Sequence, residues 1–395
     1  MDVHLATLVV VTGLAVLAPI IADFTPRGAL PVVVVEIVLG IAVGPHGLDL
    51  VTVTPLIQLL SQFGLAFLFF LAGFELDTEQ LRGQPSRLAV TSWGVSLILG
   101  MCLAGLLEAA GLVINFEYVG AALTTTALGT LIPILRDSGD IEGEFGILVM
   151  AAGAVGELGP IVLVAVLLTN STDRLLSALL LLAFAAGAVV AAVAAPHIKP
   201  RRLLMIVDST MEATGQLAVR ACVLLLTGLV YLTSRLGLDI VLGAFSAGLL
   251  ASVATGEEAR RLVAPRLDAV GFGVFVPIFF ITTGMQFDLE AVLGSVRGMA
   301  TLVLLAVLLV VVRGGPTYAL YRRVAGPADR RALALYASTG LPMIVAITTL
   351  GVAAGQMKPD GASALVGAGM LSVLMFPPLA RAARARGRVR VLDPA

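Results

Sequence analysis

The sequence predicts an all-α membrane protein of about thirteen spanning helices, and three observations support this class. Of 395 residues, 58% are hydrophobic and only 13% are charged, against roughly 25% charged in an ordinary soluble domain. Apolar runs of about 20 residues, the length that crosses the hydrocarbon of a bilayer, recur along the chain. Gly (42 residues) and Pro (19) are abundant, as expected of membrane helices that pack closely through small residues.

Breaks at polar, Gly or Pro clusters divide the chain into individual helices. The predicted spans are 5–22, 28–44, 55–75, 87–111, 117–135, 143–169, 175–196, 215–234, 238–253, 269–286, 295–321, 330–353 and 361–381. The first of them is expected to be a permanent span and not a cleavable signal peptide. No basic segment precedes it, and no small-residue cleavage site follows it.

The basic residues orient these helices, because Lys and Arg concentrate in cytoplasmic loops. With the N-terminus outside and the C-terminus inside, nineteen basic residues lie on the cytoplasmic side, and only Arg174, Arg235, Arg297 and Lys358 lie opposite. Omitting one helix would scramble this segregation. An odd count also permits two six-helix units, helices one to six and eight to thirteen, inverted across the membrane and joined by helix seven. Transporters with such repeats bind their substrate at mid-membrane.

Composition excludes several other classes of protein. A formal net charge of -1 does not suggest a nucleic-acid partner. Cys102 and Cys222 fall inside predicted spans without metal-ligand spacing and are interpreted as core residues. The three histidines lie at span ends or in loops, where a lone His is usually solvated. The spans contain no Ser/His pair, no His-Glu-x-x-His motif and no Asp pair at catalytic spacing, so we expect neither an enzyme nor a cofactor.

Five ionisable residues fall inside predicted spans, where each costs at least ~2.5 kcal/mol. They are Glu36, Glu108, Glu157, Arg220 and Arg313. Glu157 is the most deeply embedded, and the small residues around it let helices and water approach. The alternative is a structural carboxylate held by Arg313 or by a backbone group. Glu36 is a second candidate acid, with a structural or pH-sensing role as plausible as ion binding. Arg220 is expected to pair with an acid or a carbonyl.

Two predicted helices look interrupted, because each combines hydroxyl residues and Gly just before a proline. Thr125 and Thr126 mark the interruption in the fifth helix, and Ser338 and Thr339 mark the one in the twelfth. Both helices are the fifth of their six-helix unit. Paired interruptions at corresponding places are the best sequence pointer to a transporter site. The alternative is two ordinary kinked helices.

Four segments resemble the monovalent cation:proton antiporter superfamily, on its branch of bacterial sodium/proton and potassium/proton antiporters. Residues 30–45 are similar to the family's second-helix pattern that ends in Gly-Pro, and residues 67–77 to its F-L-x-G-L-E-L segment. Residues 242–248 and 277–285 match two further stretches, so the likeness covers nearly the whole chain. The resemblance implies the sodium/proton antiporter fold, in which two unwound helices cross.

The same resemblance implies a cation site on helix six, at the crossing of helices five and twelve. Glu157 takes the place of the essential carboxylate, and Gly156 stands where the family has Asn or Asp. Arg313 occupies the position of a basic residue typical of helix eleven. Members with one carboxylate are generally electroneutral, so one Na⁺ or K⁺ per proton is expected. Hydroxyl or carbonyl oxygens for the ion would come from Thr125, Thr126, Ser338 and Thr339.

Domain organisation also follows from the resemblance. Core helices within 87–169 and 295–381 are expected to slide against scaffold helices within 5–75 and 215–286, with the helix at 175–196 as linker. The scaffold would form a homodimer in the cell membrane, and no soluble regulatory domain is expected. Two other functions stay open: a sodium-coupled symporter of the same fold that carries organic anions, and a channel or transport-deficient sensor, which the loss of Asn or Asp at Gly156 suggests.

Overall fold

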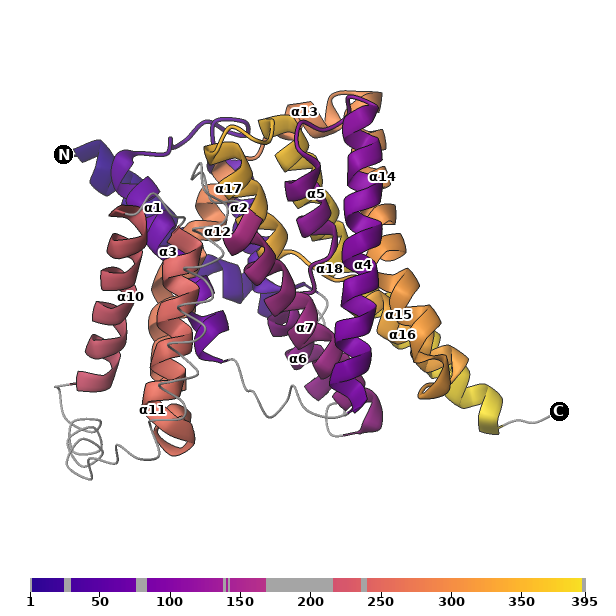
Figure 1. The fold of residues 1–395 in the computed structure, drawn as a ribbon. Coiled ribbons are helices and arrows are strands. Elements are labelled where there is room, and N and C mark those ends of the chain that lie inside the picture. The colour runs from indigo at the N-terminus through magenta and orange to yellow at the C-terminus, as the bar shows by residue number, and fades with distance from the viewer. Residues whose placement is uncertain are drawn as a thin grey trace. The chain divides into compact units, whose positions relative to one another are not determined.

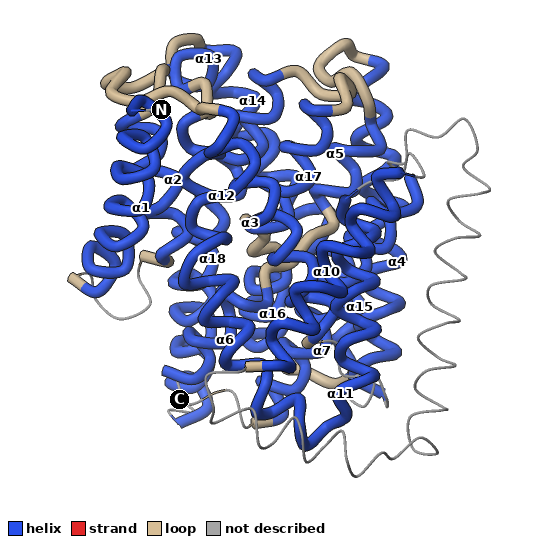
Figure 2. Tube along the Cα trace, turned by 90° about the vertical axis from the view of Figure 1, so that its left-hand side faces the viewer, coloured by secondary structure: helices blue, strands red, loops and turns tan. Residues whose placement is uncertain are grey.

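The computed structural model describes residues 2–24, 30–75, 84–137, 140, 143–167, 216–235 and 240–392. Throughout these ranges the backbone forms helices and loops without strands (Figure 2). Nine described helices are long and apolar enough to cross a membrane, and the shorter apolar helices Val32–Val43 and Ile240–Thr255 accompany them. The all-α membrane class is therefore confirmed, whereas the count of thirteen spans stays a prediction. The span expected at 175–196 lies outside the described residues.

The described helices follow the predicted spans closely in the first half of the chain. They are α1 (Asp2–Asp23), α2 (Val32–Val43), α3 (Pro55–Phe74), α4 (Gln84–Ala109), α5 (Phe116–Leu123), α6 (Leu128–Asp137) and α7 (Glu144–Leu167). One predicted span, 117–135, is thus two helices, α5 and α6, separated by four residues. The interruption expected in the fifth helix is present.

The second half departs from the predicted boundaries in several places. Its elements are α10 (Leu217–Arg235), α11 (Ile240–Val270), the π-helix η1 (Gly271–Phe275), α12 (Val276–Met285), α13 (Leu289–Leu293), α14 (Val296–Leu309), the π-helix η2 (Val310–Gly314), α15 (Gly315–Leu320), the 3-10 turn η3 (Tyr321–Arg323), α16 (Pro327–Ala337), α17 (Pro342–Ala353) and α18 (Pro359–Leu392). Helical backbone runs through the loop predicted between 253 and 269, because its Glu, Ala, Arg and Leu residues are strong helix formers.

The chain forms two compact units. The first comprises Met1–Val53, Thr78–Pro160 and Phe280–Ala395, and the second comprises Thr54–Asp77 and Ile161–Phe279. Within the second unit α11 packs against α3 and α10. Within the first unit α4 lies beside α5 (Figure 1), and α18 packs against α14, α16 and α17. The functional division into core and scaffold helices stays a prediction.

Close helix packing in the first unit depends on glycine. A Cβ atom added to Gly40 of α2 would meet the carbonyl oxygen of Ile281 on α12, and one added to Gly284 of α12 would meet the carbonyl oxygen of Ile37. The two backbones therefore touch at this crossing. Small residues make such crossings possible in membrane proteins, where contact between helices depends on van der Waals packing.

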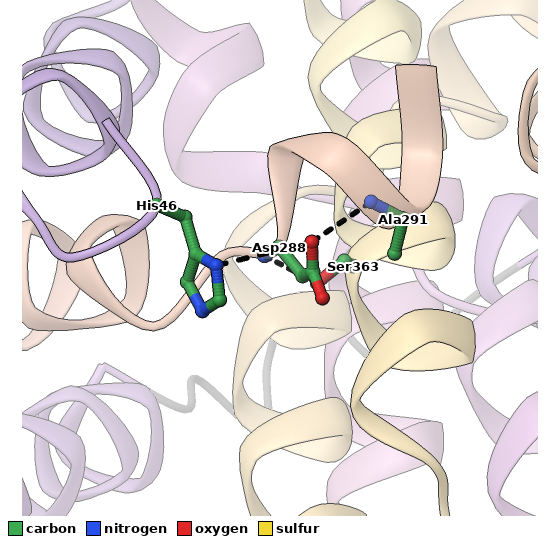
Figure 3. Close-up of polar contacts among 4 residues, drawn as sticks. All are labelled: His46, Asp288, Ala291 and Ser363. Atoms are coloured by element: carbon green, nitrogen blue, oxygen red, sulfur yellow. Dashed lines mark hydrogen bonds and ion pairs between the residues drawn. The ribbon is translucent and has the colours of Figure 1, made fainter. Parts of the chain in front are cut away.

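A polar cluster fixes the start of α13 at one end of this unit (Figure 3). Asp288 caps the helix, because its Oδ1 accepts a hydrogen bond of 2.8 Å from the Ala291 backbone N–H. The Asp288 N–H donates to the Ser363 hydroxyl of α18 at 3.0 Å. His46, in the loop after α2, brings its Nδ1 to 3.9 Å from the same carboxylate oxygen. The cluster ties the beginnings of α13 and α18 together.

Candidate functional site

The first interruption separates α5 from α6, and its threonines explain why the helix stops. Thr124 is the C-cap of α5, and α6 begins at Leu128. The Thr124 and Thr125 hydroxyls each donate 2.8 Å hydrogen bonds to backbone carbonyls three residues earlier. Consecutive β-branched residues with such local bonds compete with regular helix. Thr124, Thr125 and Thr126 are all fully buried.

The second interruption separates α16 from α17. Ser338 caps α16, and Pro342 opens α17, because a proline fits the first turn of a helix but cannot continue the preceding one. Ser338 and Thr339 are fully buried, and their hydroxyls donate to carbonyls four residues earlier. The Gly340 N–H donates to the Ser372 hydroxyl of α18 at 3.2 Å. Sequence reasoning missed Ser372, whose only signal was its place in a Gly-rich apolar helix.

The two interruptions are in direct contact. The Ala127 N–H in the first break donates to the Thr339 carbonyl in the second at 2.6 Å. A Cβ atom at Gly340 would lie only 2.5 Å from the Thr125 hydroxyl oxygen. The backbones cross at this point because position 340 has no side chain.

Helix α7 joins the crossing at Gly156. The Gly156 carbonyl accepts a 2.9 Å hydrogen bond from the Thr126 N–H, and the Thr126 hydroxyl donates to the Ala337 carbonyl at the end of α16 at 2.6 Å. Thr126 therefore links α7, the first break and the second broken helix. Three elements far apart in the sequence meet at one residue.

Arg313 is the fourth component of this junction. It lies in the π-helix η2 and is fully buried. Its Nε donates to the Thr126 hydroxyl at 3.0 Å, and its Nη2 donates to the Ala152 carbonyl of α7 at 2.6 Å. Its Nη1 has no hydrogen-bond partner among the described residues. A guanidinium is a strong donor to carbonyl and hydroxyl oxygens, so Arg313 cross-links α7 to the first break.

Gly156 leaves room for that guanidinium. A Cβ atom at this position would overlap the Thr126 hydroxyl and Arg313 Nη2. Gly156 thus stands where Arg313 needs space. The absence of a side chain at position 156 and the placement of the buried guanidinium are therefore a single structural feature.

Glu157 follows Gly156 directly on α7 and is half-buried. The predicted oxygen donors at the crossing (Thr125, Thr126, Ser338 and Thr339), by contrast, are fully buried. Glu157 is therefore the titratable acid nearest in sequence to the junction of the broken helices. No group of three His, Cys, Asp or Glu side chains suited to a resident metal ion occurs in the part of the chain that the structure describes.

The other predicted intramembrane charges lie in different surroundings. Glu36 is buried on α2, with 4% of its surface exposed, and no described residue gives it a hydrogen bond or an ion pair. The Glu108 Oε2 atom accepts a 3.3 Å bond from the Phe116 N–H, so this acid holds the α4–α5 turn. Arg220 is exposed in the first turn of α10. Of the five predicted intramembrane charges, Arg313 is thus part of the crossing, and Glu157 directly follows a residue of the crossing, Gly156.

Comparison with known proteins gives consistent matches. Residues 12–382 match the family model described as "Sodium/hydrogen exchanger, transmembrane". YjbQ of Bacillus subtilis (strain 168) is 32% identical over 301 residues, which cover 72% of this chain and 48% of YjbQ, so the chain matches about half the length of that relative. The Na⁺/H⁺-K⁺ antiporter GerN of Bacillus cereus is 25% identical over 369 residues, covering 90% of this chain and 91% of GerN. The solved structure of the sodium proton antiporter MjNhaP1 from Methanocaldococcus jannaschii matches with a TM-score of 0.65 and 16% identity, over 99% of both chains.

Proposed function

Because the chain belongs to the sodium/hydrogen exchanger family, we propose that it is a secondary active antiporter that exchanges Na⁺ or K⁺ for protons. The match to this family of transporters confirms the resemblance seen in the sequence. The structural match confirms the expected fold. The comparisons give no support to a sodium-coupled symporter. The proposal includes no enzymatic activity and no cofactor.

The crossing of the two interrupted helices is the observation that supports this function best. At this crossing the Gly156 carbonyl accepts a hydrogen bond from the Thr126 N–H. The next residue on α7 is Glu157. Hard monovalent cations prefer carbonyl, hydroxyl and carboxylate oxygens. Inverted-repeat transporters build their ion sites from such unwound segments near mid-membrane. We therefore assign the ion and proton site to Glu157, with oxygens of Thr125, Ser338 and Thr339 as supporting ligands.

A single carboxylate can couple the two ions by competition. Glu157 holds either a proton or a cation, and each neutralises its charge. An ionised, unoccupied carboxylate is expensive to move through a low-dielectric barrier. Only the two loaded forms then cross between the membrane faces, so inward movement of one ion requires outward movement of the other.

Arg313 and Thr126 hold the site together in this mechanism. The guanidinium binds α7 through the Ala152 carbonyl and the first break through the Thr126 hydroxyl. Thr126 was also a candidate ion ligand, but its hydroxyl already donates to Ala337 and accepts from Arg313. We therefore assign Thr126 chiefly to positioning. Arg313 thus holds α7 and the first break together beside the residue that precedes Glu157.

The larger arrangement is proposed from the sequence pattern. Core helices within 87–169 and 295–381 would move against scaffold helices within 5–75 and 215–286, which form a homodimer. The proposed location is the cell membrane, and the segregation of basic residues supports an N-terminus outside and a C-terminus in the cytoplasm.

The function can be tested in proteoliposomes that contain the purified protein and a pH-sensitive dye. An imposed Na⁺ or K⁺ gradient should move protons through the wild type. Glu157→Gln removes the titrating group at nearly constant shape and should abolish this movement. Glu144→Gln is the matched control, because Glu144 is an exposed acid in the first turn of the same helix.

Unchanged exchange by a folded Glu157→Gln protein would disprove the site assignment. A wild type that moves no protons in any cation gradient would contradict the antiporter itself and favour a transport-deficient sensor. Ion flux far faster than carrier turnover would favour a channel.

A further inference from the structure

A cavity of about 310 Å³ lies in the first compact unit, away from the crossing of the broken helices. Its walls come from three separate parts of the chain: the α4–α5 turn with the start of α5 at 111–119, α13 and the first part of α14 at 291–305, and the α17–α18 connection with the start of α18 at 356–365. A volume of this size is at the lower end for small-molecule sites in proteins, roughly 300–1,000 Å³. Nothing in the proposed ion-exchange mechanism uses this cavity.

Two exposed basic side chains line the cavity. Arg297 lies in the first turn of α14, and Lys358 precedes α18. Neither side chain makes a hydrogen bond or an ion pair within the described residues. Asp360 also lines the wall, so the three charged side chains leave a net positive charge. Two cations that line one cavity from distant parts of the chain favour an anionic ligand.

The charge pattern of the sequence makes two basic residues in one cavity on this side of the membrane unusual. Only four basic residues fall in loops on the side of the membrane that is poor in Lys and Arg, and Arg297 and Lys358 are two of them. Gln356 adds a neutral donor: its Oε1 accepts from Asn115 at 3.1 Å, which turns its amide nitrogen to other partners. The N-termini of α14 and α18 add partial positive charge, a contribution too general to define a site alone.

Apolar side chains share the cavity with the polar ones. Leu112, Ile114, Leu305 and Leu365 contribute to its walls. Exposed apolar side chains continue along the neighbouring helices, with Leu106 of α4 66% exposed and Val303 of α14 56% exposed. In a membrane protein such surfaces face acyl chains. The cavity therefore combines a cationic wall with apolar walls beside a lipid-facing surface.

We infer that this cavity binds the phosphate headgroup of an anionic phospholipid. Arg297 and Lys358 contact the phosphate, Gln356 donates to the headgroup, and the acyl chains lie outside along α4 and α14. The occupant is assigned to lipid and not to a soluble anion, because apolar walls and an adjoining lipid-facing surface suit an amphiphile. Basic pockets between membrane helices are known to bind anionic headgroups; by the charge pattern of the loops, this cavity lies on the side opposite the cytoplasm, so its lipid belongs to the outer leaflet.

The test compares full-length protein in nanodiscs of phosphatidylcholine with and without phosphatidylglycerol. Bound lipid is counted by native mass spectrometry, and unfolding temperature is measured in parallel. Phosphatidylglycerol should remain bound to the wild type and raise its unfolding temperature. The double variant Arg297→Gln/Lys358→Gln should bind it roughly tenfold or more weakly, since two charge-assisted contacts are lost. Arg235→Gln is the matched control, because it removes a basic residue from the same sparse set at a position outside the cavity.

Two further arms keep the result decisive. Arg297→Lys/Lys358→Arg retains both charges and should retain the lipid, which separates loss of charge from misfolding. Inorganic phosphate is added to protein in phosphatidylcholine alone. Equal stabilisation by phosphate would overturn the assignment to lipid, and undiminished phosphatidylglycerol binding by the Gln double variant would overturn the site.

Discussion

At the scale of single residues, the guanidinium of Arg313 fills the space into which a side chain at position 156 would project. A buried cation that loses its partners costs several kcal/mol (~3–5), so its bonds to Thr126 and to the Ala152 carbonyl matter for stability. A polar side chain at position 156 would displace those bonds. Gly156 and Arg313 therefore form a coupled pair, and a change at either position affects the other.

Gly156→Ala tests whether Gly156 and Arg313 are coupled in this way. The added methyl group would overlap the Thr126 hydroxyl and Arg313 Nη2, and overpacking of a buried site costs about 1–3 kcal/mol. We expect a lower unfolding temperature in detergent and slower cation/proton exchange in proteoliposomes. Gly94→Ala on α4 is the control, because nothing lies within 4 Å of its added Cβ. Equal behaviour of the two variants would show that the space at position 156 is not needed.

The Thr126 hydroxyl bridges Arg313 and the Ala337 carbonyl, so two substitutions of Thr126 should differ in their effects. Thr126→Val keeps the volume but removes the hydroxyl, which leaves Arg313 Nε and the Ala337 carbonyl unpaired, at a cost of about 1–3 kcal/mol for each buried group. Thr126→Ser keeps the hydroxyl and should stay close to the wild type. Thermal unfolding and exchange rate measure both. A Val variant as stable and active as the Ser variant would contradict the bridge.

At the scale of elements, the crossing of α2 and α12 depends on backbone contact and leaves no side chain that could move aside. Gly40→Ala would place a Cβ against the Ile281 carbonyl oxygen and 3.0 Å from the Gly284 Cα. The helices must separate, so we expect a large fall in unfolding temperature and in the yield of folded protein. Gly13→Ala on α1, with open space around its Cβ, should be neutral. A stable Gly40→Ala protein with unchanged unfolding temperature would show that the contact is not required.

The sequence predicted elements where local chemistry decides the backbone. Both interruptions follow from clustered hydroxyls with Gly and Pro, and both are present, at 124–127 and 338–341. The π-helices at 271–275 and 310–314 were missed, because an extra residue in a helical turn leaves no signal in hydropathy. The loop expected between 253 and 269 was wrong, since charged residues suggested a break while their helix propensity favoured continuation.

The site shows the same limit. The residues around the crossing could be named from the sequence, since hydroxyls, glycine and buried charge are visible there. The partners could not: Thr126 bonds to Ala337, 211 residues away, and Arg313 bonds to the Ala152 carbonyl, 161 residues away. A backbone acceptor has no sequence signature, so only the folded chain shows which oxygens Arg313 uses. The ion-binding role of Glu157 stays a prediction.

At the scale of the whole molecule, the number of titrating acids on the ion path sets the energetics of exchange. One carboxylate that holds either ion moves one charge in each direction, and the membrane potential then does no net work. Glu36 is a buried acid that could add a proton. It lies on α2 next to the Gly40 crossing, whereas Glu157 lies on α7 beside the broken helices. We propose that Glu36 is not part of the transported charge.

Electroneutral exchange follows from that assignment and can be measured directly. In K⁺-free proteoliposomes, with a gradient of the permeant anion thiocyanate setting the voltage, the initial rate of Na⁺-driven proton movement should be the same at zero and at negative-inside potential. The direction of flux should reverse where the proton and Na⁺ gradients are equal, whatever the voltage. For a second proton, each 100 mV would contribute about 2.3 kcal/mol and shift the reversal point. Such a shift in the wild type, and its loss in Glu36→Gln, would show that Glu36 carries the second proton.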